Sequence, residues 1–199
     1  MKICVFSSSS NAIAPVYVEE AVKLARLIGE SGQTLVNGGA NVGLMERILE
    51  TASATGAKTI GVIPEKLKDY NLVSKHAQEL IISKDMMERK ATMRELSDAF
   101  VALPGGFGTL EEILEVITLK QLDYHNKAIV FLNTNGFYDD LFKQFERSYN
   151  ENFAKPAYRD LYHVAWTSEE LMSYLASYKP HAAVNKWYHI PQAPEALEE

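Results

Sequence analysis

Short apolar runs alternate with longer amphipathic segments along this chain. Continuous apolar runs predict buried strands, and apolar positions three and four residues apart predict helices between them. The predicted strands are 2–7, 34–36, 58–63, 80–83, 99–103, 128–132 and 162–166. The predicted helices are 15–32, 44–54, 86–96, 137–153 and 168–178, the last of them capped by Thr167 or Ser168. A further helix follows a glycine-rich turn and has apolar positions at Leu110, Ile113, Leu114 and Ile117. Residues 65–78 show no clear period and predict a loop.

This alternation of strands and helices indicates crossover units, and hence a mostly parallel sheet that is covered on both faces. The predicted fold class is α/β, a three-layer, doubly wound domain. A length of 199 residues suits one domain with one sizeable core. We expect that domain to span 1–179, followed by a C-terminal tail, 180–199, which carries prolines and aromatic residues.

The charge balance narrows the classes of function. A net charge of −6 without a long basic run argues against nucleic-acid and anionic-membrane partners. The single cysteine, Cys4, lies in the first apolar run, which suits a core position and a reducing compartment. No signal peptide or membrane-spanning run is evident, so we expect a cytoplasmic protein. The five histidines are dispersed without metal-ligand spacing, so we expect no metal.

The segment 103–112, Leu-Pro-Gly-Gly-Phe-Gly-Thr-Leu-Glu-Glu, carries the strongest chemical signal. Gly105, Gly106 and Gly108 follow a predicted strand and open a helix, which brings bare backbone N–H groups to a helix N-terminus. Such a turn favours a phosphate cradle completed by Thr109. A tight turn that merely needs glycine is the alternative. No lysine follows the last glycine, so the segment is not a Walker loop.

Two further polar loops follow predicted strands. Gly38 and Gly39 follow the second strand, and Ser9 lies in a serine run, 7–10, after the first. Ligands of doubly wound sheets bind beyond the carboxyl ends of the strands, so these loops and the glycine motif are expected to form one composite site. The serine hydroxyls either bond a sugar or phosphate or form an ordinary polar turn.

Glu112 has two interpretations. Thr109 and Glu112 fit a capping box, which would give the glutamate a structural task. A catalytic carboxylate beside the phosphate cradle is the alternative. Glu115 falls on the same helix face, where a second carboxylate would raise one of the two pKa values.

Arg89 and Lys90 lie at the start of a predicted helix, where a cation opposes the helix dipole. One interpretation is a surface pair balanced by Asp85 and Glu88. The other is that Arg89 reaches over the sheet edge to a phosphate or ribose oxygen, a task that suits its forked donors.

Taken together, Pro-Gly-Gly-x-Gly-Thr-x-x-Glu at 104–112, Glu-Arg-Lys at 88–90 and Gly-Gly-Ala-Asn-Val-Gly-Leu-Met at 38–45 resemble the LOG (LONELY GUY) family. The resemblance runs from about residue 2 to about residue 175. Its members are cytokinin riboside 5′-monophosphate phosphoribohydrolases, often labelled as lysine decarboxylases. It implies a Rossmann-like fold, a homodimer or higher homo-oligomer, and no cofactor.

The resemblance assigns roles by position. Arg89 and Glu112 match the catalytic pair; Gly105, Gly106, Gly108 and Thr109 match the phosphate loop; Lys90 and Thr118 match substrate-contacting positions; and Glu115 matches an acid common on that helix. This chain has Ser8, Asn37, Ala40 and Asn71 where the family usually has glycine, tyrosine, glycine and glutamate. These differences leave the phosphate loop intact and bear on base preference and turnover.

The implied activity is hydrolysis of the N-glycosidic bond of an adenosine 5′-monophosphate, N6-substituted or plain, to free base and ribose 5-phosphate. A nucleotide carrier or sensor of the same fold that does not hydrolyse is one alternative, because fold does not fix function. Action on another nucleoside monophosphate, or ribosyl transfer, is a second. Decarboxylation needs an electron sink such as pyridoxal phosphate on a lysine, and no lysine here has a context that suggests this.

Overall fold

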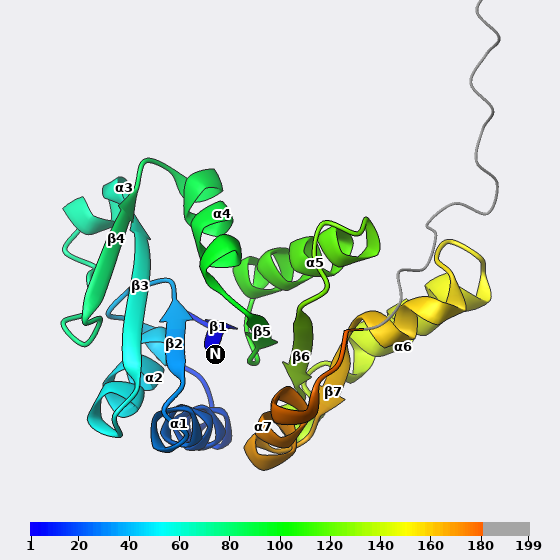
Figure 1. Ribbon diagram of the computed structural model, residues 1–199, viewed down its shortest axis with the longest axis horizontal. Coiled ribbons are helices and arrows are strands. Elements are labelled where there is room, and N and C mark those ends of the chain that lie inside the picture. The colour runs from blue at the N-terminus through cyan, green and yellow to red at the C-terminus, as the bar shows by residue number, and fades with distance from the viewer. Residues whose placement is uncertain (181–199) are drawn as a thin grey trace, which may run out of the picture.

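A seven-stranded, entirely parallel sheet forms the centre of the protein in the computed structural model, which describes residues 1–180 (Figure 1). The strands are β1 (Lys2–Phe6), β2 (Thr34–Asn37), β3 (Lys58–Pro64), β4 (Glu79–Ser83), β5 (Ala99–Ala102), β6 (Ala128–Leu132) and β7 (His163–Ala165). Their order across the sheet is β4-β3-β2-β1-β5-β6-β7. The α/β, doubly wound prediction is confirmed.

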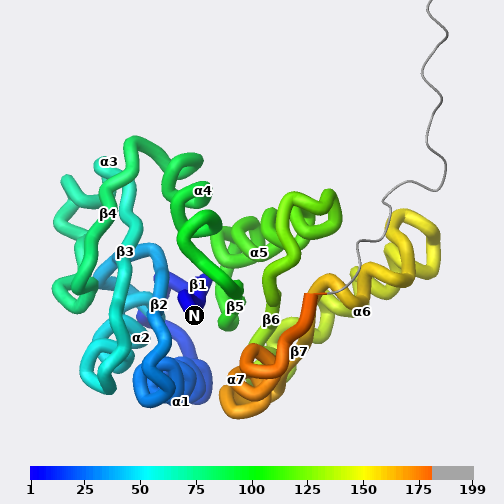
Figure 2. Tube along the Cα trace, viewed as in Figure 1, coloured from blue at the N-terminus to red at the C-terminus, as the bar shows by residue number. Residues whose placement is uncertain are grey.

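Helices cover both faces of the sheet (Figure 2). The helices are α1 (Pro15–Glu30), α2 (Gly43–Ala54), α3 (Glu65–Asp69), α4 (Met86–Leu96), α5 (Phe107–Gln121), α6 (Asp139–Asn150) and α7 (Ser168–Ser177), with short 3-10 turns η1 (Thr134–Gly136) and η2 (Pro156–Leu161). One apolar core joins the sheet to α1, α2 and α7, and a second joins it to α4, α5 and α6. Both faces of the inner strands are therefore buried, which explains their continuous apolar runs.

The strand order reverses between β1 and β5. The chain winds outward from β1 through β2 and β3 to β4, then returns to the other side of β1 with β5. Loops at the carboxyl ends of these two central strands diverge to opposite sides, which opens a crevice at that edge of the sheet. The serine run follows β1 and the Pro-Gly-Gly turn follows β5, so both signals meet at this switch point.

Two predictions about local structure were wrong, and a third was right only in part. The predicted loop 65–78 contains the short helix α3, and Val73 bridges back to Ala40. The helix predicted from residue 137 begins only at Asp139, because η1, with Asn135 at φ 55°, precedes it. The buried face of α5 is also rotated from the predicted one, and it consists of Thr109, Glu112, Ile113, Val116 and Lys120.

The predicted apolar face of α5 is half right. Ile113 is fully buried, whereas Leu110, Leu114 and Ile117 are only partly buried and pack at the margin of the second core. The last helix is capped as predicted, by the Thr167 hydroxyl, which accepts a hydrogen bond from the backbone N–H of Glu170 at 3.2 Å.

None of the helices within residues 1–180 has the length and apolarity that crossing a membrane requires. Beyond Pro180, the predicted tail lies outside the described residues. The division into one domain and a tail, and the expected homodimer, stay predictions.

A buried hydrogen bond ties α6 to the Pro-Gly-Gly turn. The Tyr138 hydroxyl, in a side chain that is 1% exposed, donates to the carbonyl of Leu103 at 2.6 Å. We expect Tyr138→Phe to lower the free energy of unfolding in urea by about 1–2 kcal/mol, because the carbonyl loses a buried donor. Tyr124→Phe is the matched control, since Tyr124 is 75% exposed, and we expect it to change stability little. Equal effects of the two substitutions would contradict this account.

Candidate functional site

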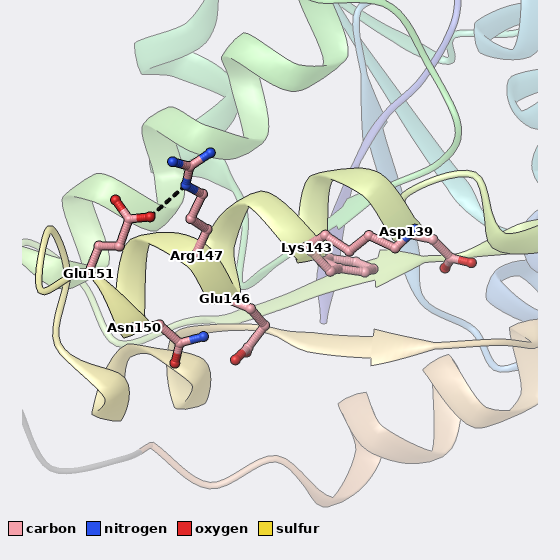
Figure 3. Close-up of a pocket in the computed structure, with 7 residues that line it drawn as sticks. Asp139, Lys143, Glu146, Arg147, Asn150 and Glu151 are labelled. Atoms are coloured by element: carbon pink, nitrogen blue, oxygen red, sulfur yellow. Dashed lines mark hydrogen bonds and ion pairs between the residues drawn. The ribbon is translucent and has the colours of Figure 1, made fainter.

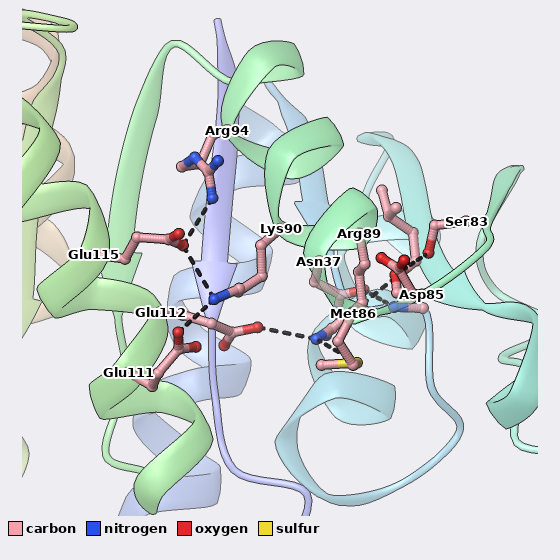
Figure 4. A network of polar contacts seen from close by, with 12 residues as sticks. Asn37, Ser83, Asp85, Met86, Arg89, Lys90, Arg94, Glu111, Glu112 and Glu115 are labelled. Carbon is pink, nitrogen blue, oxygen red and sulfur yellow. Dashed lines mark hydrogen bonds and ion pairs between the residues drawn. The ribbon is translucent and has the colours of Figure 1, made fainter.

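A buried ion pair between α4 and α5 is the centre of the candidate site (Figure 4). Arg89 Nη1 lies 3.0 Å from Glu112 Oε1, and each side chain is only 10% exposed. The Arg89 Nε–H also donates to the carbonyl of Val62 on β3, at 3.1 Å. The guanidinium therefore bridges a strand end and a helix, and its position is fixed at both ends.

The loop after β2 is shaped around this guanidinium. A Cβ at Gly38 would lie 2.1 Å from Arg89 Nη2, so only glycine leaves the room. The next residue, Gly39, has a φ of +67°. Asn37 is fully buried and holds this turn: its Oδ1 accepts from the Gly39 N–H at 2.9 Å, and its Nδ2 donates to the Met45 carbonyl at 3.0 Å.

The ion pair faces a cleft of about 410 Å³ at the switch point. Its walls come from the loops after β1, β2 and β5 and from α2, α3, α4 and α5; the lining residues include Ser7 to Ser10, Gly38, Met45, Leu67, Met86, Arg89, Met93, Gly106 to Thr109, Glu111 and Glu112. A volume of this size suits a small ligand. The buried Ser7 Oγ, also on the wall, has no hydrogen-bond partner within residues 1–180.

The N-terminus of α5 opens into the same cleft. Gly106 is its N-cap residue, and no described side chain caps the first N–H groups. Apart from the adjacent residues and the backbone of α5 itself, nothing within residues 1–180 lies within 4 Å of the position that a Cβ would take at Gly106 or Gly108. At Gly105 that position is filled, because the Thr109 Oγ1 would be 2.1 Å away. Free backbone donors at a helix N-terminus, with open space before them, suit an anion.

The capping-box interpretation of Thr109 and Glu112 was wrong. The helix α5 starts at Phe107, so Thr109 lies inside it and Glu112 turns inward to Arg89. The surface-pair interpretation of Arg89 was wrong too, because Arg89 is buried against Glu112, and Asp85 and Glu88 instead bond backbone N–H groups at the start of α4. Asp85 Oδ1 accepts from the Glu88 N–H at 2.9 Å, and Glu88 Oε2 accepts from the Lys84 N–H at 2.6 Å.

Burial raises the pKa of Glu112, and the nearby Arg89 opposes that rise. The negative charge of Glu111 adds a further increase. The expectation was that Glu112 and Glu115, on one helix face, would raise one of their two pKa values. Glu115 has no part in the raised pKa of Glu112, because it is paired with Lys90 at 3.5 Å and with Arg94 at 2.7 Å. A desolvated carboxyl with one specific cation partner, in a cleft, is a strong functional candidate.

Similarity to known proteins identifies the family. The chain is 38% identical over 179 residues to cytokinin riboside 5′-monophosphate phosphoribohydrolase LOG5 of Arabidopsis thaliana. The aligned residues make up 90% of this chain and 78% of that relative. It is 40% identical over 180 residues to probable cytokinin riboside 5′-monophosphate phosphoribohydrolase LOGL3 of Oryza sativa, and the aligned residues make up 90% of this chain and 85% of that relative. The chain belongs to the LOG family. A family model described as "Possible lysine decarboxylase" also matches residues 45–175.

Solved structures share the fold. A molybdenum cofactor binding protein from the phototrophic bacterium Rippkaea orientalis superposes with a TM-score of 0.68 at 25% sequence identity, over 88% of this chain and 95% of that one. The Rossmann-like architecture of this LOG-family chain is thus shared with a protein described as binding a different ligand.

Not all of the residues predicted to bind substrate lie in this cleft. Of the substrate-binding candidates, Ser9, Gly38, Gly106, Gly108 and Thr109 line the cleft, and Gly39 and Gly105 support it from the adjoining positions. The other three are outside its lining, and their substrate contacts stay predictions; they are Lys90, Glu115 and Thr118.

Thr118 lies farther along α5. Its Oγ1 donates to the Leu114 carbonyl at 2.8 Å, and it lines a separate groove of about 170 Å³ with Phe145 and Tyr158. This groove lies between α5, α6 and η2, on the far side of α5 from the Arg89–Glu112 pair.

Sequence reasoning missed the apolar wall of the cleft. Met86 and Met93 line it with Arg89, and the spacing of these three positions on α4, three and then four residues apart, puts them on one helix face. That spacing was the available signal. Met45 and Leu67 complete the wall from α2 and α3, and only the tertiary fold brings them there.

A second hollow, of about 650 Å³, runs along the exposed face of α6 (Figure 3). One helix supplies its lining, including Arg147 and Glu151, which form an exposed ion pair at 2.7 Å. It contains no buried polar group of the kind found in the cleft. Within residues 1–180, no His, Cys, Asp and Glu side chains are grouped as a metal site.

The close contact of Gly38 with Arg89 predicts a specific coupling. We expect Gly38→Ala to lower the free energy of unfolding by about 1–3 kcal/mol, because the new methyl group displaces the guanidinium. In an Arg89→Ala background, the same substitution should cost less than about 0.5 kcal/mol. Urea unfolding of the four proteins measures this double-mutant cycle. An unchanged cost of Gly38→Ala without the arginine would show that some other contact is responsible.

Proposed function

We propose that this protein hydrolyses the N-glycosidic bond of an adenosine 5′-monophosphate, plain or N6-substituted, and releases the free base and ribose 5-phosphate. The observation that carries the proposal is the buried Arg89–Glu112 pair, which faces a cleft beside the uncapped N-terminus of α5. An anion-binding helix end and a desolvated carboxyl in one cleft match the two ends of a ribose 5-phosphate unit. The names of the curated relatives support the same activity.

The phosphate is bound in this proposal by backbone N–H groups at Gly106 to Thr109. Binding this remote group positions the sugar and lowers the barrier at the reacting carbon. The bond from C1′ to the base nitrogen breaks, and its electron pair leaves with the base, which gains a proton. Water adds to C1′ and loses a proton. The transition state has oxocarbenium character, as in glycoside hydrolysis.

Glu112 has the central chemical role. Its carboxylate faces the developing positive charge at C1′ and orients the attacking water, while Arg89 keeps it ionised and in place. The methionines and Leu67 of the cleft wall provide apolar contact for the planar base. Flexible thioether side chains adapt to bases with different substituents.

The decarboxylase description of the matched family model has no support from this cleft. Amino-acid decarboxylation on pyridoxal phosphate needs a lysine amine that can reach the cofactor. The described residues that line the cleft include an arginine but no lysine. Burial lowers the pKa of Lys120 to about 8, but its Nζ donates to the Lys127 carbonyl and the Tyr178 hydroxyl, at 3.0 and 2.9 Å.

A non-hydrolytic carrier is the second candidate. The similarity in fold to a molybdenum cofactor binding protein favours it, because that protein is named for binding and not for a reaction. A carrier would hold its nucleotide-like ligand at the same helix N-terminus. It would not need a buried glutamate held against an arginine, which is why we prefer hydrolysis.

The proposal is tested by incubation of the protein with AMP, isopentenyl-adenosine monophosphate and a panel of purine and pyrimidine monophosphates. Free base and ribose 5-phosphate are measured together. Equal amounts of both products from an adenine nucleotide support the proposal. Binding without product in every case supports the carrier, and base release without ribose 5-phosphate indicates ribosyl transfer.

We expect Glu112→Gln to lower turnover by about 100-fold or more while the dissociation constant for AMP stays within about threefold. The amide cannot carry the charge that faces C1′, but the phosphate contacts remain. Base release and calorimetric titration measure the two effects. Glu95→Gln, at an exposed position on α4, is the control. Because burial raises the pKa of Glu112, the wild-type rate should climb with pH at values above the ordinary glutamate range. Full activity of Glu112→Gln would remove this residue from the chemistry.

The open space at Gly108 predicts a loss of binding without a loss of folding. Alanine suits a helical position better than glycine, so Gly108→Ala should leave thermal stability unchanged or raise it. Its methyl group enters the space before the first turn of α5, and we expect AMP affinity to fall at least about tenfold. Adenosine, which lacks the phosphate, should bind equally to both proteins. Unchanged AMP affinity would refute the proposed phosphate position.

A further inference from the structure

A chain of charges links α4 to α5 next to the buried pair (Figure 4). Lys90 Nζ contacts Glu111 Oε1 and lies 3.5 Å from Glu115 Oε2, while Arg94 Nη1 lies 2.7 Å from the same Glu115 oxygen. The Lys90 side chain is 17% exposed, whereas that of Glu111 is 57% exposed. Lys90 is therefore almost as enclosed as Arg89, and it is directed to carboxylates on α5.

The two ion pairs run in parallel. Arg89 and Lys90 are neighbours on α4, and Glu112 and Glu111 are neighbours on α5. Arg89 pairs with Glu112, and Lys90 pairs with Glu111 and, at a longer distance, with Glu115. Glu111 also lines the cleft, so an unneutralised charge there would act on Glu112. Like charges on adjacent groups disfavour the ionised form of both, and an enclosed cation reverses that effect.

We propose that Lys90 is a positioning residue for the hydrolysis suggested above, which neutralises Glu111 and so lets Glu112 stay ionised against Arg89. The inference rests on the proposed function for its catalytic meaning. In this proposal Lys90 acts on the reaction through Glu111 and Glu112 and does not contact the substrate.

The charges around Glu112 agree with this role. From α4, Arg89 and Lys90 both lower the pKa of Glu112, and from its own helix Glu111 raises it. From β1, Cys4 is fully buried, and burial raises its own thiol pKa so that it stays neutral. Removing Lys90 thus withdraws one favourable charge and exposes Glu112 to the full effect of Glu111.

The experiment compares Lys90→Met with Lys90→Arg and with Arg94→Met. Arg94→Met is the matched control, because it removes a cation that also joins α4 to α5 but pairs with Glu115. The direct measurement is a pH titration of the Glu112 carboxyl carbon by NMR in protein labelled with ¹³C-glutamate, without substrate. The signal is assigned by its disappearance in Glu112→Gln.

We expect the Glu112 signal of Lys90→Met to titrate at higher pH than in the wild type. Lys90→Arg and Arg94→Met should titrate as the wild type does. The rate of base release by Lys90→Met should fall roughly fivefold or more on the acid limb of its pH profile and stay within about twofold on the plateau. Lys90→Met combined with Glu111→Gln should bring the titration back toward the wild type, and it leaves no unpaired acid at position 111 to disturb folding.

Two outcomes overturn the inference. One is an unchanged Glu112 titration in Lys90→Met with a raised KM at every pH, which is the signature of substrate contact. The other is an unchanged titration with equal losses of stability in Lys90→Met and Arg94→Met, which is the signature of a structural clamp alone. A wild type that releases no base refutes the proposed function, and the NMR titration still decides whether Lys90 controls Glu112.

Discussion

The Arg89–Glu112 ion pair is the constraint around which the edge of this sheet is organised. A buried ion pair seldom stabilises a fold, because removing two charges from water costs about as much as their attraction returns. Here the surroundings supply what the pair needs. The Val62 carbonyl accepts from the guanidinium, and Gly38 leaves room for it. Burial still raises the pKa of Glu112, so the site holds a carboxylate at a cost to stability, which is typical of a functional group.

The topology decides where this pair can form. At the switch between β1 and β5, the chain provides loops at the carboxyl edge that diverge and leave a crevice. Arg89 comes from the helix that follows the edge strand β4, and Glu112 from the helix that follows the central strand β5. The two helices pack on the same face of the sheet, which brings residues far apart in sequence into contact.

Much of the fold could be predicted from the sequence, and less of the site. Every strand was predicted. The inner strands are continuous apolar runs because both of their faces are buried, and the edge strands β4 and β7 keep short apolar runs although they are only partly buried. The glycine turn was predicted at a helix N-terminus, where it lies. The pairing of Arg89 with Glu112 did not follow from spacing alone, because Thr109 and Glu112 mimic a local capping box. Local patterns are visible in one sequence, whereas a contact between two helices depends on their packing. The family resemblance, rather than the spacing, marked both residues.

The N-termini of α4 and α5 differ in how their first backbone N–H groups are bonded. At α4 the sequence caps the helix with Asp85, whose side chain accepts a backbone hydrogen bond, a feature worth about 1 kcal/mol. At α5 Gly106 stands in that place and no described side chain caps the helix. A side-chain cap would fill the space in front of Gly108 that an incoming anion would occupy. Helices α1, α2 and α6 also begin without a side-chain cap, so the missing cap alone does not set α5 apart. What sets it apart is that its first N–H groups lie on the wall of the cleft. In the proposed function, this open helix end is where the phosphate binds.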